Sequence, residues 1–292
     1  MSGSWEDREV MQEVWAGKLP AVFSLAEADT ELGEAEEAPA PCYLMLPRMS
    51  YLPLAMDKVR KHFTDCLRPG AQDNTSQMWF SHRGTPLRWH QPIGLLYDLL
   101  CSGGQELPWA ITVHLSGFPT DQLLPLHTRD QVETVFMSAL KEADQLKHSG
   151  KVMSLMQKKD HNQLWLGLTS DKFDQFWAIN RKLMEPLGPG DEGFRHIPVR
   201  FHLAGVDNSG QATSNIVQRL ISPGLSLGEV IKDMGWGSEA RSVNTDKEHK
   251  KLYNRLFRVI TQGVSPDPST PILWMSRHLS YPDNFLHIVI VL

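Results

Sequence analysis

One short stretch of the chain matches a pattern that enzymes use for covalent catalysis. Residues 224–228 read Gly-Leu-Ser-Leu-Gly, and G-x-S-x-G in α/β-hydrolases places a nucleophilic serine on a sharp turn between a strand and a helix. The stretch also fits a simpler role, because Ser226 followed three residues later by Glu229 forms the capping box that opens a helix. A hydrolase needs several parallel strands before this serine, and the sequence that precedes Ser226 predicts too few strands. We therefore expect Ser226 to cap a helix.

The other residue types that catalyse reactions or bind metals occur without a recognisable spacing. The 12 histidines and three cysteines do not form the H-E-x-x-H or paired-cysteine patterns of zinc sites. Cys42, Cys66 and Cys101 are odd in number and far apart, which argues against a disulfide framework. We expect the cysteines to be small core residues, and we expect no metal, no cofactor and no catalytic residue.

A lysine near the middle of the chain offers a different chemistry. Lys141 lies in a predicted helix, where Asp144, Gln145 and His148 would share its polar side. On local sequence alone, an ordinary solvated lysine paired with Asp144 is the better interpretation. An exposed lysine amine is also the group that accepts a ubiquitin-like modifier through an isopeptide bond. The elements around Lys141 therefore have to decide between the two interpretations.

Composition limits the possible partners and compartments. With 292 residues and 41% hydrophobic content, the chain can form two or three compact units. Its formal net charge of −5 and its pI of about 6.2 give no broad basic face, so we expect no nucleic acid partner. The acidic N-terminus lacks the pattern of a signal peptide, so we expect the protein to be cytoplasmic. No apolar run is long enough to cross a membrane, and any membrane contact would be peripheral.

The first part of the chain predicts a ubiquitin-like β-grasp domain at residues 18–117. A short helix that begins near Glu6 comes before it, and an acidic, solvated loop at 26–40 interrupts it. The elements follow one another in the order of a fold in which a mixed sheet wraps one helix. They are strands at 19–25, 42–47 and 109–115, a helix at 54–67, a hairpin that turns at Arg83-Gly84 and a short helix at 92–100.

Helical periodicity replaces the strand pattern at residues 131–187, after a linker at 118–130. Three apolar stripes predict the helices of this helix-rich domain. The stripes consist of Val132, Phe136, Leu140 and Ala143, of Val152, Leu155 and Met156, and of Phe173, Phe176, Trp177 and Leu183.

The strand pattern returns at residues 193–292 and predicts a second β-grasp domain. Both β-grasp domains contain Pro-Ile at the start of a short helix, at Pro92 and at Pro271, before a closing strand. This repetition indicates an internal duplication. The predicted fold class is therefore α+β, with two ubiquitin-like β-grasp domains flanking a helix-rich domain and a short N-terminal helix at 1–17.

Several long runs of the sequence resemble the autophagy protein 5 family. They are rich in Trp, His and Met, and the similarity extends through nearly the whole chain, except the loops 26–40 and 235–249. The runs are "YLMLPRMSYLPLAMDKVRKHF", "GTPLRWHQPIGLLYDLL", "FMSALKEADQLKH", "MQKKDHNQLWLGL", "FDQFWAINRKLM" and "LSYPDNFLHI". The resemblance implies two ubiquitin-like domains flanking a helix-rich domain, in agreement with the predicted order of elements.

The resemblance also implies a non-catalytic function in autophagy. In that family, the lysine of the motif matched by "MSALKEAD" accepts the C-terminal glycine of the ubiquitin-like autophagy protein 12, and the matching residue is Lys141. Dedicated activating and conjugating enzymes deliver the modifier, and the conjugate binds autophagy protein 16. The complex then acts like a ubiquitin ligase and promotes lipidation of autophagy protein 8 with phosphatidylethanolamine. The protein would be cytoplasmic and peripheral on the phagophore membrane.

Two features of the chain ends suit this role. The sequence ends at "IVIVL" without a diglycine, so we expect the protein to receive a modifier rather than to be one. The N-terminal helix is too short to be stable alone, and we expect Val10, Val14 and Trp15 to dock it. The resemblance implies that this helix and the two ubiquitin-like domains receive an amphipathic helix of autophagy protein 16 in a groove.

A basic set of residues in the helix-rich domain suggests contact with anionic lipid. A solvated helix surface is the competing interpretation, because each such charge contributes only about 1 kcal/mol near an anionic leaflet. The set consists of Lys151, Lys158, Lys159, Arg181 and Lys182. For the whole chain, the alternative function is that of a ubiquitin-fold adaptor that binds partners without being conjugated, with Lys141 incidental.

Overall fold

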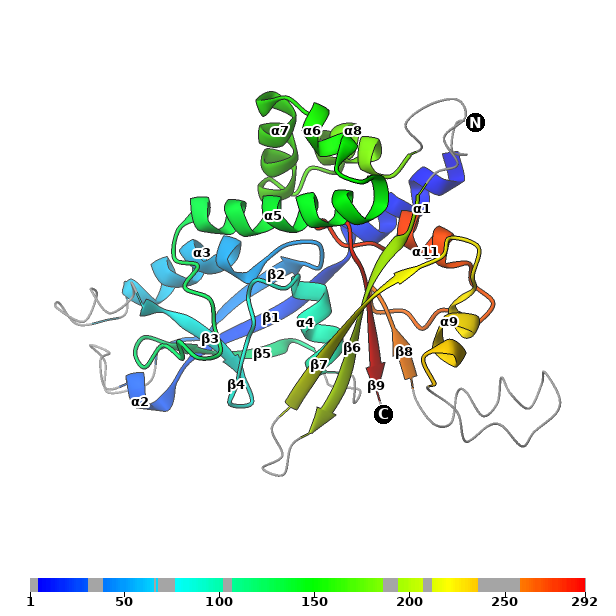
Figure 1. The fold of residues 1–292 in the computed structure, drawn as a ribbon. Helices are drawn as coiled ribbons and strands as arrows, with labels where there is room; N and C mark the ends of the chain where they lie inside the picture. Colours follow the sequence, from blue (N-terminus) through cyan, green and yellow to red (C-terminus); the bar gives the residue numbers. More distant parts are fainter. Residues whose placement is uncertain are drawn as a thin grey trace. The chain divides into compact units, whose positions relative to one another are not determined.

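The structure, a computed structural model, describes residues 5–30, 39–65, 67, 77–101, 107–185, 194–206, 212–235 and 258–291 (Figure 1). Cys66 and most of the loop 235–249 lie outside these residues. The described chain divides into two compact units. One unit contains the first sheet; the other contains helix α1 (Trp5–Ala16) up to Trp15, the helices after Phe136 and the second sheet. None of the described helices is long and apolar enough to cross a membrane.

The first sheet has five strands in the order β2-β1-β5-β3-β4. Its first strand pairs antiparallel with β2 and parallel with β5, so the sheet is mixed. Side chains alternate along β1, and Leu19, Ala21 and Phe23 face the core. The strands are β1 (Lys18–Leu25), β2 (Cys42–Pro47), β3 (Trp79–His82), β4 (Thr85–Pro86) and β5 (Trp109–His114).

Two helices belong to this unit. Helix α3 (Leu52–Thr64) buries Leu52, Met56, Val59 and Phe63 at helical spacing, and helix α4 (Ile93–Leu100) begins after Pro92. Between them, Arg83 and Gly84 both have positive φ angles, of 50° and 79°, as the tight turn of a two-residue hairpin requires. The predicted mixed sheet with one main helix is confirmed here.

The second sheet repeats this plan with four strands in the order β7-β6-β9-β8. The opening strand β6 pairs parallel with the closing strand β9, and β8 pairs antiparallel with β9. One face carries Val199, Phe201 and Ile288, which pack with helix residues such as Leu227 and Met275 in one core. The elements are β6 (Ile197–Val206), β7 (Ala212–Ile221), α9 (Leu227–Asp233), β8 (Arg258–Ile260), α11 (Ile272–His278) and β9 (Leu286–Val291).

The two sheets share the connectivity that the sequence repetition indicated. In each, the opening strand lies between its neighbour in sequence and the parallel closing strand, and a short helix precedes that closing strand. Proline is the N-cap of both short helices, at Pro92 and Pro271, where its missing N–H removes no helical hydrogen bond.

The helix-rich part consists of one long helix and several short ones, packed closely. Helices α7 and α8 approach so closely that a Cβ on Gly167 would lie 2.6 Å from the backbone nitrogen of Phe176. Helix α1 docks through buried Trp15, whose ring lies 4.9 Å from that of Phe176 between centroids. The helices are α5 (Arg129–His148), α6 (Lys151–Leu155), α7 (Lys158–Thr169), α8 (Phe173–Asn180) and a 3-10 turn at Arg181–Leu183.

Two sequence-based expectations are wrong in detail. The acidic loop is not solvated throughout, because α2 (Glu27–Thr30) begins it and buries Asp29. The Asp29 carboxylate accepts hydrogen bonds from the backbone N–H of Leu115 and the hydroxyl of Ser116, at 3.0 and 3.2 Å. Leu155 was expected in an apolar stripe, yet it is 79% exposed, because α6 ends at that residue.

Candidate functional site

Lys141 lies on the exposed side of α5, the longest of the described helices. The helix begins with a reciprocal cap, in which the N–H of Gln131 donates to the Thr128 hydroxyl and the N–H of Thr128 donates to the Gln131 side chain. In the unit that contains Lys141, Phe136 and Leu140 are buried and Lys141 points away from them. Among the described residues, none forms a hydrogen bond or ion pair with the Lys141 amine.

The expected polar face around Lys141 is wrong for two of its members. Asp144 is buried, and its carboxylate accepts a hydrogen bond of 2.8 Å from the N–H of Met153 in α6. His148 is buried as well, with its ring 5.3 Å from that of Phe194. The buried stripe of α5 is therefore wider at its C-terminal end than its apolar residues indicate, and Asp144 connects two helices instead of pairing with Lys141.

Lys147 is a second lysine of the same helix in the opposite environment. Its side chain is 1% exposed, and its amine lies 3.4 Å from the sulfur of Met184 and 5.0 Å from the ring centroid of Phe194. Burial lowers the pKa of Lys147 to about 7, although the negative charges of Asp283 and Asp144 oppose the shift. Near neutral pH this amine is thus partly uncharged, and it is out of reach of solvent.

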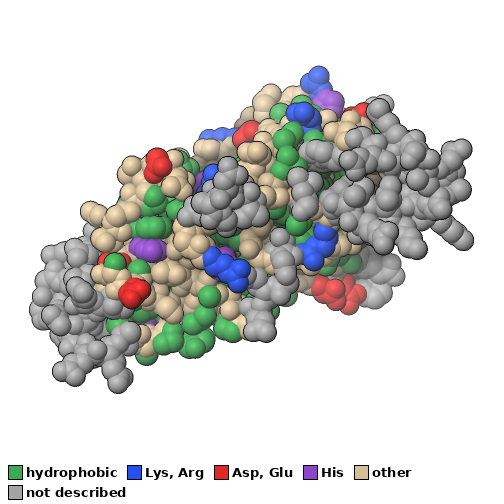
Figure 2. All heavy atoms as spheres, turned by 90° about the horizontal axis from the view of Figure 1, so that it is seen from below, with side chains coloured by type: hydrophobic (Ala, Val, Ile, Leu, Met, Phe, Trp, Pro, Cys, Tyr) green, Lys and Arg blue, Asp and Glu red, His purple; other side chains and the backbone are tan. Residues whose placement is uncertain are grey.

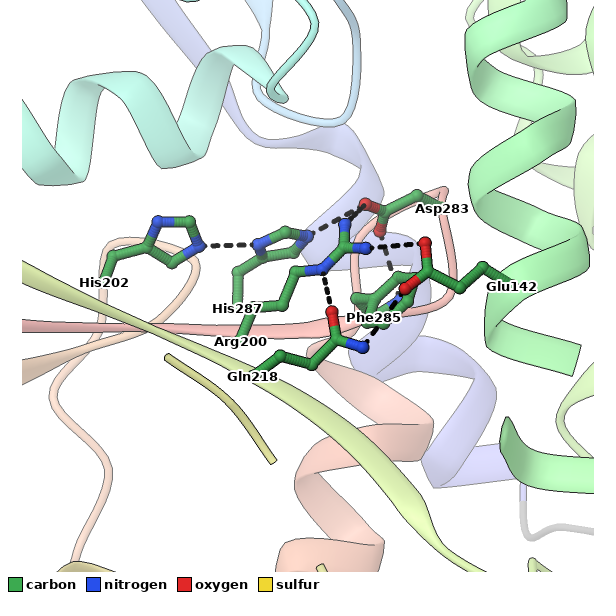
Figure 3. Close-up of polar contacts among 7 residues, drawn as sticks. All are labelled: Glu142, Arg200, His202, Gln218, Asp283, Phe285 and His287. Carbon is green, nitrogen blue, oxygen red and sulfur yellow. Dashed lines mark hydrogen bonds and ion pairs between the residues drawn. The ribbon is translucent and has the colours of Figure 1, made fainter. Parts of the chain in front are cut away.

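Glu142, next to Lys141, is held by two side chains of the second sheet (Figure 3). One carboxylate oxygen accepts a hydrogen bond of 3.0 Å from Nη2 of Arg200 on β6, and the other accepts one of 3.1 Å from the Gln218 amide on β7. Arg200 Nε also donates to Gln218 Oε1 at 2.9 Å. We call Glu142, Arg200 and Gln218 the Arg200 cluster; its three members bond one another in a ring of contacts.

A chain of buried polar groups lies beside the Arg200 cluster (Figure 3). Asp283 Oδ2 is 3.9 Å from Arg200 Nη1 and accepts a hydrogen bond of 2.9 Å from His287 Nε2. His287 Nδ1 lies 2.9 Å from His202 Nε2. Burial alone would raise the pKa of Asp283, but His287, Arg200 and the N–H of Phe285 outweigh it and hold that pKa below its usual value.

Comparisons with known proteins match the three regions of the chain. Family models described as "Autophagy protein ATG5, UblA domain", "alpha-helical bundle region" and "UblB domain" match residues 14–115, 129–186 and 196–290. Autophagy protein 5 of Drosophila melanogaster is 46% identical over 282 residues, covering 97% of this chain and 96% of that protein. The chain belongs to the autophagy protein 5 family. The predicted family resemblance is confirmed, and the chain has a role in autophagy.

More distant members of the family span the chain to the same extent. Autophagy-related protein 5 of Caenorhabditis elegans is 35% identical, covering 98% of both chains, and autophagy protein 5 of Arabidopsis thaliana is 33% identical, covering 97% of this chain and 98% of that protein. The crystal structure of Kluyveromyces marxianus Atg5 is 20% identical, with a TM-score of 0.74 over 97% of this chain and 99% of that one. The α+β fold class with two ubiquitin-like domains is thereby confirmed.

The serine of the hydrolase-like pattern is a helix cap in this family member. The Ser226 hydroxyl donates to the Glu229 carboxylate at 2.7 Å, and the Glu229 N–H donates back to the hydroxyl at 3.4 Å. The Glu229 carboxylate also accepts the N–H of Ser226 at 2.8 Å. The capping box expected from the sequence is confirmed, and the hydroxyl has a carboxylate partner rather than a histidine.

The described cysteines are buried thiols. Burial raises the pKa of Cys101 to about 12 and also raises that of Cys42, so neither is a thiolate at neutral pH. Among the described residues, no group of three His, Cys, Asp or Glu side chains could hold a metal ion. On the face shown in Figure 2, the described Lys and Arg side chains are scattered among acidic and uncharged ones.

The residues expected to contact partners or membrane have different surroundings. Trp15 is buried and Val14 packs against the core of the second sheet, so both hold α1 in its unit, whereas Val10 is half-exposed. Of the basic set, Lys182 forms an ion pair of 3.3 Å with Asp160. Lys182 is nevertheless exposed, as are the other four members: Lys151, Lys158, Lys159 and Arg181.

A lysine-to-methionine change at position 147 tests the burial of this charge. The unfolded chain binds a proton at Lys147 up to about pH 10.4, while the folded chain loses it near pH 7. Stability should therefore rise with pH across this window, because the unfolded state binds more protons there. We expect Lys147→Met to stabilise the fold by about 1–4 kcal/mol at pH 7 and to remove most of that rise, as measured by urea unfolding at several pH values. The exposed Lys141→Met is the matched control and should leave the pH dependence as in the wild type; equal slopes in all three proteins would contradict the assignment.

Proposed function

We propose that this autophagy protein 5 family member is the covalent acceptor of the ubiquitin-like autophagy protein 12, through an isopeptide bond on Lys141. The observation that carries the proposal is the exposed position of Lys141 on α5, within the run "MSALKEAD" that resembles the family's acceptor motif. Its amine is exposed, and no described residue forms a hydrogen bond or ion pair with it. An accepting amine has to be reachable and free to attack, and Lys141 meets both conditions.

The proposed reaction is the aminolysis of a thioester. The Lys141 ammonium first loses a proton to solvent, and the lone pair of the amine attacks the carbonyl carbon that joins the modifier's C-terminal glycine to the cysteine of a conjugating enzyme. A C–N bond forms and the C–S bond breaks. The sulfur leaves as a thiolate, which takes up the proton that the nitrogen loses as the amide forms. The chain itself supplies a positioned amine, and we infer that it is a non-catalytic scaffold.

We further propose that the outer face of the first sheet contributes to binding an amphipathic helix of autophagy protein 16. On this face Tyr43 and Met45 of β2 are 66% and 60% exposed, and Val22 of β1 lies between Tyr43 and Ala110 in the strand register. These neighbours are apolar or aromatic, as a helix-in-groove contact requires. Val10 belongs to the other unit, where it is half-exposed on α1, and is a separate candidate contact for the same partner.

The junction of α6 and α7 suits peripheral contact with an anionic membrane. Leu155 is 79% exposed, and the exposed side chains of Lys151, Lys158 and Lys159 belong to the same two helices. An exposed leucine among lysines can enter the interfacial region while the amines meet lipid phosphates. With this contact, the conjugate would work in the cytoplasm and at the phagophore membrane as a ligase-like factor for lipidation of autophagy protein 8.

The acceptor assignment predicts a single covalent product. With activating enzyme, conjugating enzyme, ATP and autophagy protein 12, the wild type should gain the mass of the modifier, and branched-peptide mass spectrometry should place it on Lys141. Lys141→Arg should give no product, since arginine keeps the charge and helix propensity but stays protonated. Lys172→Arg, at another exposed lysine, should be conjugated at the wild-type rate. If the Lys141→Arg variant forms the conjugate, or if the wild type forms none with active enzymes, the result would favour the function of an adaptor that is not conjugated.

The sheet-face assignment predicts weaker binding after one substitution. Tyr43→Asp should lower the affinity for a labelled autophagy protein 16 helix by about 30-fold or more, because buried aromatic anchors contribute about 2 kcal/mol or more to such interfaces. The far-UV circular dichroism should stay unchanged, since Tyr43 is exposed. Leu124→Asp, at an exposed leucine away from the strands, should leave the affinity as it is. Equal affinities in fluorescence anisotropy would refute this docking face.

The membrane assignment predicts a charge-dependent and leucine-dependent partition. In flotation with vesicles that contain anionic lipid, Lys158→Glu with Lys159→Glu should lower the bound fraction, since each lysine contributes about 1 kcal/mol. Leu155→Asp should lower it as well, by removing the apolar contact. Lys58→Glu with Lys61→Glu, two exposed positions on α3, is the matched double reversal and should float like the wild type. If both double variants float equally, the contact does not involve α6 and α7.

A further inference from the structure

Glu142 is an exposed residue with an unusually well-defined partner. Isolated surface ion pairs contribute little, because two long side chains must be ordered to form them. Arg200, however, is already ordered: its guanidinium carbon lies 3.5 Å from the ring centroid of Phe285, and its side chain is only 21% exposed. Glu142 therefore contacts a guanidinium whose position is already fixed by the sheet. Its two carboxylate oxygens accept hydrogen bonds from side chains of two different strands, Arg200 of β6 and Gln218 of β7.

The Arg200 guanidinium is also held in place by the buried groups next to it, which cannot easily move. Asp283 and His287 are fully buried, and Asp283 Oδ1 also accepts the N–H of Phe285 at 3.1 Å. Asp283, as a carboxylate, accepts the proton on His287 Nε2, and the other ring nitrogen of His287, Nδ1, shares one proton with His202 Nε2. The residues that face this chain from neighbouring elements include Lys147 on α5, whose amine feels the charge of Asp283.

We propose that Arg200 is a positioning residue for the acceptor lysine, holding the turn of α5 that carries Lys141 against strands β6 and β7 through Glu142. The inference rests on the proposed function of Lys141. Successive residues of a helix project about 100° apart, so a tie at Glu142 fixes the backbone at Lys141 and leaves the lysine side chain free. Position matters for this reaction, because a small misplacement of a reacting group can lower its rate about 100-fold.

The Arg200 cluster offers variants that separate a forked hydrogen bond from a charge. Glu142→Ala removes the tie at an exposed position, so the fold should remain. Glu142→Gln removes the charge but keeps an oxygen that accepts from Arg200. Arg200→Lys keeps the positive charge beside Asp283 but cannot contact Glu142, Gln218 and Asp283 together. Lys172→Arg, an exposed site outside the cluster, serves as the control.

Two measurements on the full chain test the proposal. The first is hydrogen exchange of the α5 backbone, where Glu142→Ala and Arg200→Lys should speed exchange around residues 139–145 by about threefold or more. The second is the single-turnover rate of conjugation against the concentration of conjugating enzyme loaded with autophagy protein 12. The maximal rate should fall about tenfold in both variants, with the half-saturating concentration unchanged, and Glu142→Gln should retain most of the wild-type rate.

The outcomes separate this inference from the proposed function. Unchanged exchange in Glu142→Ala and Arg200→Lys would overturn the positioning role, whatever the conjugation assay gives. Equal losses in Glu142→Gln and Glu142→Ala would also overturn it, because the charge of Glu142 would then be what matters. If the wild type is not conjugated by active enzymes, the proposed function fails, and the assignment of Arg200 to an acceptor fails with it even where exchange changes.

Discussion

The carboxylate of Asp283 is buried just before the closing strand of the second sheet, and much of the nearby structure serves to keep it charged there. A carboxylate removed from water is costly unless hydrogen bonds and opposite charges replace the solvent. His287, Arg200 and the N–H of Phe285 supply them. Because Arg200 must lie over Phe285 to reach Asp283, its outer edge is presented to Glu142. The burial of one acid thus helps to position the guanidinium that holds α5 at Glu142.

The C-terminal half of α5 also buries polar side chains against specific partners. Asp144, Lys147 and His148 are all buried, yet each has a distinct contact: the Met153 N–H, the Met184 sulfur and the Phe194 ring. Such residues contribute less stability than apolar ones of equal size, since their desolvation must be offset. They make the attachment specific instead, because a helix rotated by one residue would leave these polar groups without partners.

Much of the fold was predictable from the sequence, because most of the longer strands and helices show their own periodicity, and the turn residues at Arg83-Gly84 and the cap at Ser226 act locally. The errors at polar residues share a different cause. Asp29, Asp144 and His148 were assigned to solvent by residue type, but their partners lie elsewhere in the chain. The Arg200 cluster was missed, since Glu142 and Arg200 are 58 positions apart. A signal was present in "FLHIVIVL" and "FHL": a lone histidine at a strand position facing away from the apolar core.

Of two lysines in α5, Lys147 has the more reactive amine and Lys141 has the accessible one. Lys147 has the amine with the lowered pKa and would be the stronger nucleophile at neutral pH, yet it is 1% exposed. A thioester held by another protein cannot reach it. Lys141 is six residues earlier on the same helix and is exposed. Under the proposed function, the choice of Lys141 as acceptor therefore depends on its position rather than on the basicity of its amine. In the proposed function, every contact that fixes α5 helps to position Lys141, and the hydrogen bonds of Glu142 are one such contact.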